Sequence, residues 1–215
     1  MLLDGGFVRR RLELGPRDPR SDERRRRRIF PGAAQVLAHV EGLEADHRLR
    51  GLVRHRIYFY DSPPLAGVQR NPIDGGAFDF ARHPEYEQNK QLQGDLAQAP
   101  DVAVRRGELK FRGWRVRASS MREVTTVPRL LAAGDLVPDV EQKGVDLRIG
   151  IDIALLALRR VVNIVVLVTG DSDLVPAMKL ARREGLKVYL DTMGHNVARS
   201  FTEHADYVFP PRLSS

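Results

Sequence analysis

The chain of 215 residues contains no cysteine, which excludes disulfide bridges, thiolate metal sites and a cysteine nucleophile. It also lacks a long apolar run, because the longest one, around Val161–Val168, is interrupted by Asn163. A membrane-spanning helix takes about 20 apolar residues, so we expect no membrane segment. Asp4 follows Met1-Leu2-Leu3 directly, which leaves no hydrophobic core for a signal peptide. We therefore expect a cytoplasmic protein.

Common ligand-binding motifs are also absent. The six histidines show neither HxH nor HExxH spacing, so a zinc site is not expected. Neither GxGxxG nor GxxxxGK[ST] occurs, which removes the main support for dinucleotide or P-loop nucleotide binding.

Lysine is scarce, with 5 residues against 30 arginines, and the net charge is +7. Residues 1–56 hold 14 basic and 8 acidic side chains, which accounts for +6 of that charge. A basic excess favours polyanionic partners such as RNA. The arginine bias of a GC-rich coding sequence explains the run Arg24–Arg28 equally well, so both interpretations of that run stay open.

The C-terminal half predicts a parallel α/β sheet. Val161–Thr169 has the β-branched, apolar pattern of a strand buried on both faces. The ranges that follow predict, in order, a helix, a strand, a helix and a strand, at 174–184, 186–190, 196–203 and 207–209. This order implies right-handed crossovers between parallel strands.

Upstream elements extend the same architecture. Leu2–Leu3 predicts the stub of a first strand, and further elements are a strand at 56–60, a helix at 85–98 and a helix at 147–158 capped by Asp146. The ranges 102–106 and 108–112, on either side of Gly107, predict a hairpin or a strand with a reversed extension. We expect one three-layer α/β/α sandwich over residues 1–215, with a mainly parallel, Rossmann-like sheet and mobile segments near 15–28 and 62–84.

Four aspartates fall where such a sheet binds ligands, beyond the carboxyl ends of its strands. Asp4, Asp171 and Asp173 follow expected strands, and Asp146 begins a helix. Converging carboxylates repel one another, and a divalent cation with hard oxygen ligands, Mg²⁺ or Mn²⁺, removes that penalty. Such clusters perform metal-assisted displacement at phosphorus. The alternative is that each aspartate only caps a helix or forms a turn, as Asp173 before Leu174 would.

The segment Thr169-Gly170-Asp171-Ser172-Asp173-Leu174-Val175-Pro176 resembles the GDxDFxP segment of the NYN domain family, in its LabA-like branch. Further segments agree in order along nearly the whole chain: Asp4-Gly5-Gly6-Phe7, Arg56–Asp61 before Pro63-Pro64, Lys143-Gly144-Val145-Asp146, and Ala205-Asp206. The resemblance implies a PIN-like nuclease fold, which is often dimeric, so a homodimer is a candidate assembly.

The resemblance further implies a metal-dependent ribonuclease site. Its catalytic and metal-binding residues would be Asp4, Asp146, Asp171 and Asp173, with Lys143 contacting a phosphate of RNA. Many members of the family carry asparagine three residues after the first aspartate, where this chain has Phe7. That difference favours the alternative of a non-catalytic RNA-binding or regulatory module with a degenerate site.

The segment 105–122 interleaves basic side chains with Phe111 and Trp114. Basic groups contact phosphates and aromatic rings stack on unpaired bases, which is the pattern of single-strand binding. The residues we expect to bind substrate there are Arg105, Arg106, Lys110 and Arg112. The alternative is a hairpin whose two aromatic side chains pack inward.

Two other acidic patterns give weaker support for a function. Asp171–Val175 fits the DxDx[TV] motif of haloacid dehalogenase-type phosphatases, but that motif normally follows the first strand of its domain and here comes late. Asp152 lies six residues after Asp146, about 240° around a helix, so the two cannot share a face. We expect Asp152 to pair with Arg148 or with a neighbouring element.

Overall fold

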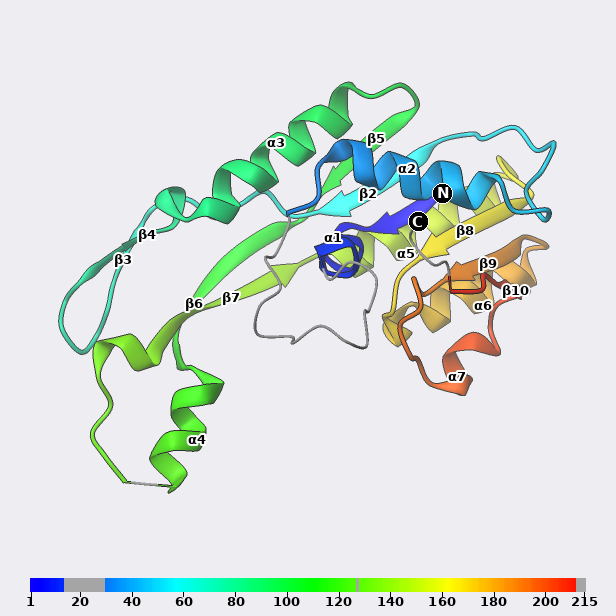
Figure 1. Cartoon of the computed structure of the whole chain (residues 1–215). Coiled ribbons are helices and arrows are strands. Elements are labelled where there is room, and N and C mark those ends of the chain that lie inside the picture. Colours follow the sequence, from blue (N-terminus) through cyan, green and yellow to red (C-terminus); the bar gives the residue numbers. More distant parts are fainter. Residues whose placement is uncertain (14–29, 127, 212–215) are drawn as a thin grey trace, which may run out of the picture.

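A computed structural model describes residues 1–13, 30–126 and 128–211. Its main sheet has six strands in the order β10-β9-β8-β1-β2-β5, and every pairing in it is parallel (Figure 1). The strands are β1 (Leu2–Asp4), β2 (Ile57–Asp61), β5 (Val102–Arg106), β8 (Ile164–Val168), β9 (Lys187–Asp191) and β10 (Tyr207–Val208). The expected parallel sheet is confirmed.

Helices cover both faces of the sheet. One face packs against α1 (Gly5–Glu13), α2 (Ala33–Glu44) and α3 (Pro84–Gln98). The other packs against α5 (Val145–Leu158), α6 (Val175–Arg183) and α7 (Arg199–Thr202). The architecture is therefore the three-layer α/β/α sandwich. None of the helices in the described ranges is both long and apolar enough to cross a membrane.

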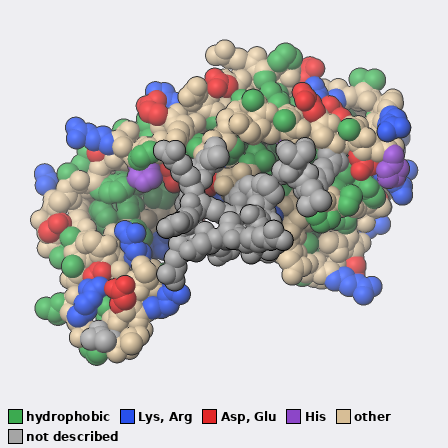
Figure 2. All heavy atoms as spheres, viewed as in Figure 1, with side chains coloured by type: hydrophobic (Ala, Val, Ile, Leu, Met, Phe, Trp, Pro, Cys, Tyr) green, Lys and Arg blue, Asp and Glu red, His purple; other side chains and the backbone are tan. Residues whose placement is uncertain are grey.

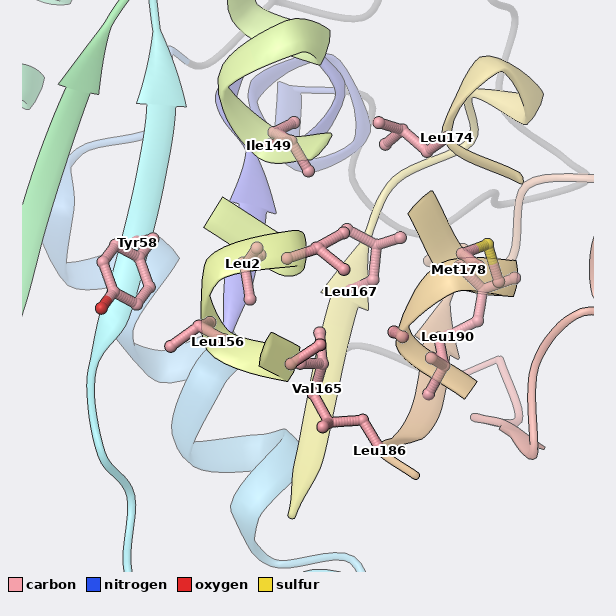
Figure 3. Close-up of a cluster of buried hydrophobic side chains, with 14 of the residues drawn as sticks. Leu2, Tyr58, Ile149, Leu156, Val165, Leu167, Leu174, Met178, Leu186 and Leu190 are labelled. Carbon is pink, nitrogen blue, oxygen red and sulfur yellow. The ribbon is translucent and has the colours of Figure 1, made fainter. Parts of the chain in front are cut away.

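Alternation along the strands divides the core into two layers. Leu2 and Leu167 point toward α5, where they meet Ile149 (Figure 3). Leu3 points to the opposite face and packs with Phe59 and the first group of helices. β1 is only three residues long and fully buried. Its last residue, Asp4, therefore lies at the carboxyl edge of the sheet, directly after the core residues Leu2 and Leu3.

The direction of winding reverses at β1. From β1 the chain adds β2 and then β5 on one side, and it later returns to place β8 on the other side of β1, followed by β9 and β10. The crevice between the carboxyl ends of β1 and β8 is thus the topological switch point, where open parallel sheets bind their ligands.

A second structural region, which we call the arm, comprises β6 (Glu108–Val116), β7 (Leu136–Lys143) and the chain between them. Its two strands pair antiparallel, and α4 (Ala118–Thr126) and the short η3 (Ala133–Asp135) lie at the far end (Figure 1). A smaller hairpin, β3 (Val68–Arg70) and β4 (Ala77–Asp79), runs alongside and leads through η2 (Phe80–Arg82) into α3.

Of the two interpretations of 102–106 and 108–112, the hairpin is wrong. β5 pairs with β2 in the main sheet, whereas β6 pairs with β7. The chain leaves the sheet at Gly107, whose N–H donates to the carbonyl of Asp61 at 2.8 Å. A Cβ at Gly107 would lie 2.7 Å from the carbonyl oxygen of Lys143, so glycine here allows a close backbone approach rather than a turn.

Two expectations of mobility have different outcomes. Residues 62–84 contain the β3–β4 hairpin and η2, and their mobility stays a prediction. Residues 15–28 lie outside the described residues, as does the run Arg24–Arg28.

Candidate active site

Asp4 is held at the switch point by two hydrogen bonds. Its Oδ1 accepts the N–H of Phe7 at 3.0 Å, in the first turn of α1, and its Oδ2 accepts the hydroxyl of Thr169 at 3.2 Å. Thr169 directly follows β8, and its Oγ1 also accepts the N–H of Asp171 at 3.1 Å. Thr169 therefore links the ends of the two strands and fixes both aspartates relative to each other.

Asp171 and Asp173 lie on the turn that follows. The Oδ1 of Asp171 accepts the N–H of Asp173 at 2.9 Å and caps η4 (Ser172–Leu174). The alternative that Asp173 only caps the next helix is wrong, because Leu174 occupies the N-cap of α6. Asp171 performs the capping that the sequence pattern assigned to its neighbour, and the exposed carboxylate of Asp173 is left for other contacts.

Asp146 does not cap α5, contrary to expectation. The N-cap is Gly144, with φ of 74°, and Asp146 lies in the first helical turn. Among the described residues its carboxylate has no hydrogen bond or ion pair. Burial raises its pKa, and the negative charges of Asp171, Asp4 and Asp173 raise the pKa further. The structure thus brings the four predicted aspartates within electrostatic reach of one another.

Asp4 is the most buried of the four, with 8% of its surface exposed. Burial raises its pKa and the charge of Asp171 adds to that shift, while the Phe7 N–H and the charge of Arg10 oppose it. Arg10 is therefore the cation that most affects Asp4, yet it does not offset the cost of burial. The cluster keeps excess negative charge at the switch point.

The donor set suits a hard divalent cation. Carboxylate oxygens are the ligands that Mg²⁺ and Mn²⁺ prefer, and positive charge would relieve the mutual repulsion. Within the described ranges, no three His, Asp or Glu side chains are already arranged to enclose a metal ion. Mg²⁺ commonly binds through one or two carboxylates and keeps several waters, so the residues present fit such an ion.

Phe7 and His195 border the cluster. Phe7 is 6% exposed, and its Cε2 would lie 2.7 Å from a Cβ built at Gly170, so the ring packs directly on the turn before Asp171. The exposed ring of His195 meets Phe7 edge to face, with centroids 6.1 Å apart. No sequence pattern marks His195, because its proximity to Gly170 arises only when the loop after β9 folds over the end of β8.

Asp61 forms a second acidic group on the opposite face of the sheet. It ends β2, is 1% exposed, and pairs with the Arg9 guanidinium at 3.0 Å. Its Oδ1 accepts the N–H of Ser62 at 2.8 Å and the amide of Gln142 at 3.3 Å. Burial raises its pKa, although Arg9 opposes that effect. Asp61 is not among the predicted site residues, although its place at the end of the strand beside β1 is a usable signal.

The basic residues predicted to bind RNA all have partners within the chain. On the arm, Glu141 pairs with Arg112 at 2.8 Å and with Lys143 at 3.6 Å, and Lys110 pairs with Glu108 at 3.7 Å. Their side chains stay about half exposed, so these partners leave them accessible.

The two arginines of β5 are engaged in the same way. Arg106 donates to the Oε1 of Gln93 at 3.4 Å, and Arg105 pairs with Asp152 at 3.1 Å. Asp152 also accepts the hydroxyl of Tyr60 at 2.9 Å, which confirms the expectation that it pairs with a neighbouring element.

Comparison with known families bears directly on this site. The family model described as NYN domain matches residues 94–212, more than half of the chain. The chain belongs to the NYN domain family. The matched range contains Lys143, Asp146, Asp171 and Asp173 and begins after Asp4. No curated protein and no solved structure matches the chain.

NYN domains are in general nuclease-like and related to RNA. This family assignment agrees with the position of Asp171, which follows β8 at the switch point rather than the first strand of the domain. The family assignment gives no support to the haloacid dehalogenase-type phosphatase.

Proposed function

We propose that this NYN domain is a metal-dependent ribonuclease of the LabA-like branch that hydrolyses RNA phosphodiester bonds. One observation supports this most directly: at the switch point, burial and the negative charges of neighbouring aspartates raise the pKa values of Asp4 and Asp146, and no ion pair within the described residues neutralises these two carboxylates. A site that keeps such repulsion in the folded state gains stability when a cation binds, and Mg²⁺ or Mn²⁺ suits its oxygen ligands.

Each aspartate has a distinct part in this proposal. Asp4, fixed by Thr169 and the Phe7 N–H, and Asp171, fixed by its own cap, would hold the cation most rigidly. Asp146 and Asp173, which are exposed, would contact it directly or through water. When bound, the cation supplies an activated water and neutralises charge on the phosphoryl oxygens.

RNA would approach along the exposed basic side chains beside this edge. Lys143 precedes Asp146 by three residues and would contact the phosphate next to the cleaved bond. Arg105, Arg106, Lys110 and Arg112 would contact the backbone farther along the strand, exchanging their present partners for phosphates.

The test is cleavage of labelled RNA by purified protein with Mn²⁺. Asp171→Asn removes one carboxylate charge while keeping the shape of the side chain, and we expect at least about 100-fold slower cleavage, because metal-site contacts contribute several kcal/mol. Asp139→Asn is the matched control, since Asp139 lies on the arm and pairs with Arg115. Equal cleavage by wild type and Asp171→Asn would refute the proposal.

The alternative function is a non-catalytic RNA-binding or regulatory module. Phe7 favours it, because an apolar ring packs against the turn before Asp171 where many relatives carry asparagine. Titration calorimetry separates the two: the alternative predicts RNA binding with no Mn²⁺ binding. The homodimer and the cytoplasmic location stay predictions.

A further inference from the structure

A cavity of about 300 Å³ lies outside the aspartate cluster, between α3, the arm and the β3–β4 hairpin. Figure 2 shows apolar side chains gathered at this place, between the small hairpin and the arm. The volume is at the lower end of the range for small-ligand pockets, which is about 300–1,000 Å³. The cavity therefore has room for one ring-sized group rather than for a folded segment.

Its wall combines aliphatic side chains and prolines with aromatic rings. Phe78, Phe80 and Tyr86 line it together with His83. Phe78 and Phe80 meet edge to face with centroids 5.0 Å apart, and Phe78 contacts Trp114 in the same way at 6.0 Å. These contacts orient the rings of Phe78 and Phe80. They also show that Trp114 packs inward against the hairpin, as the inward-packing alternative for 105–122 predicted.

The polar groups at the cavity would select a neutral occupant. Arg9 lines it, but the carboxylate of Asp61 neutralises that guanidinium at 3.0 Å. Asn89 is 6% exposed, and its Oδ1 accepts a hydrogen bond from Gln93 at 3.4 Å, while its own amide N–H groups have no partner among the described residues. Glu85 adds an acceptor at the rim. Rings for stacking and edges for hydrogen bonding match a flat, uncharged heteroaromatic group.

We propose that this cavity binds one unpaired nucleobase of a single-stranded RNA, beside the aspartate cluster. The choice of RNA as the ligand rests on the proposed function, whereas the choice of a base rests on the cavity itself. Stacking on aromatic side chains recognises unpaired bases with little dependence on sequence. Base-paired RNA would be excluded, because its bases are not available for insertion.

The cavity and the aspartate cluster lie on two sides of one polar layer. Arg9, at the cavity, pairs with Asp61, and Asp61 accepts the amide of Gln142. The Oε1 of Gln142 would lie 3.3 Å from a Cβ on Gly6, and that same Cβ would lie 3.5 Å from Oδ1 of Asp4. A strand with one base in the cavity would therefore pass its backbone over this layer to reach Asp4.

The experiment measures the affinity of short RNA in EDTA, where no cleavage complicates binding. The two probes are an oligouridylate and the same sugar-phosphate backbone without bases. We expect Phe78→Ala to weaken binding of the oligouridylate about tenfold, which corresponds to about 1.4 kcal/mol, and to leave binding of the base-free backbone unchanged. Leu130→Ala, at an apolar side chain 93% exposed on the arm, is the matched control.

A second variant guards against misfolding, since Phe78 has several aromatic neighbours. Tyr86→Ala removes a lining ring whose one aromatic or cation–π contact within the described residues is with Lys90, and we expect the same selective loss. Trp114 is the only tryptophan, so its emission reports whether each variant retains the packing of this region. An RNA duplex of equal length should bind to each of the two variants with the same affinity as to the wild type.

The outcomes separate this inference from the proposed function. Base-dependent binding that Phe78→Ala and Tyr86→Ala reduce supports the cavity, even if no Mn²⁺-dependent cleavage occurs. Equal affinity for the two probes refutes the cavity, even if cleavage is found. A variant that weakens both probes to the same degree also refutes it, because the loss then does not involve a base.

Discussion

The carboxyl edge of the main sheet and the arm shift the pKa values of their acidic side chains in opposite directions. At the edge, partial burial raises the pKa of Asp146, and the negative charges of the other three aspartates raise it further. On the arm, Asp135 has a lowered pKa, because it accepts two hydrogen bonds from the Arg129 guanidinium at 2.6 and 2.8 Å and one from the Ala132 N–H. Paired charges support local structure, whereas unneutralised ones are available to a ligand.

The two regions also have opposite pH dependence. The folded state stabilises the ionised form of Asp135. Its contribution to the stability of the folded state is therefore present above the unfolded pKa of 3.8 and is lost as the pH falls through the lower folded pKa. Asp4 and Asp146 bind protons more tightly in the folded state, so folding gains from them at low pH. That gain is lost as the pH rises above 3.8 through their raised folded pKa values.

The largest effect on structure is expected from Asp135→Asn. A neutral amide cannot form the ion pair that the Asp135 carboxylate makes with the Arg129 guanidinium. The segment from α4 to η3 should therefore unfold locally more often. Limited proteolysis with trypsin should cut this segment about tenfold faster, while the main sheet stays intact.

Glu87→Gln provides the control for that experiment. Glu87 and Lys90 form an exposed pair at 3.8 Å on α3, and exposed pairs contribute little. If Asp135→Asn and Glu87→Gln are cut at the same rate as wild type, the arm does not depend on its paired charges.

A smaller effect of opposite sign is expected at the edge. Asp146→Asn removes one of the repelling charges and should raise the melting temperature at pH 7 by about 2 °C without metal. The increase should shrink as the pH falls toward 3.8, where the carboxylate of the wild type becomes protonated too. Calorimetric melting across this pH range measures it, and a lower melting temperature at pH 7 would show that Asp146 is satisfied in the folded state.

The smallest effect concerns RNA contacts on the arm. Glu141 pairs with both Arg112 and Lys143, so Glu141→Gln frees two cations without adding any. If these side chains contact phosphates, affinity for single-stranded RNA should rise about twofold, with a steeper dependence on salt. Fluorescence anisotropy at several salt concentrations tests this, and unchanged affinity would place the RNA elsewhere.

The sequence predicted the elements whose patterns are local. The apolar run before Thr169 and the helical spacing after Leu174 correspond to β8 and α6, because burial on both faces and an amphipathic period leave direct traces in composition. The topology of a parallel sheet gathers strand-end residues at one edge, so the sequence could also place the four aspartates together; their role as metal ligands stays a prediction.

Elements that depend on distant partners were missed. β7 includes Pro138 and Asp139, which are poor strand formers, and it exists because β6 pairs with it. α1 begins with Gly5 and Gly6, and its first turn is fixed by Asp4 rather than by helix propensity. The position of His195 likewise follows from how two loops meet, which no local pattern encodes.

The central claim is that the repelling aspartates form a cation site, and melting with and without Mn²⁺ at pH 7 tests it most directly. A ligand present at 100 times its dissociation constant stabilises a protein by about 2.7 kcal/mol. We expect Mn²⁺ to raise the melting temperature of the wild type and of Asp139→Asn, and to have little effect on Asp171→Asn. An equal shift in all three proteins, or no shift in the wild type, would contradict the claim.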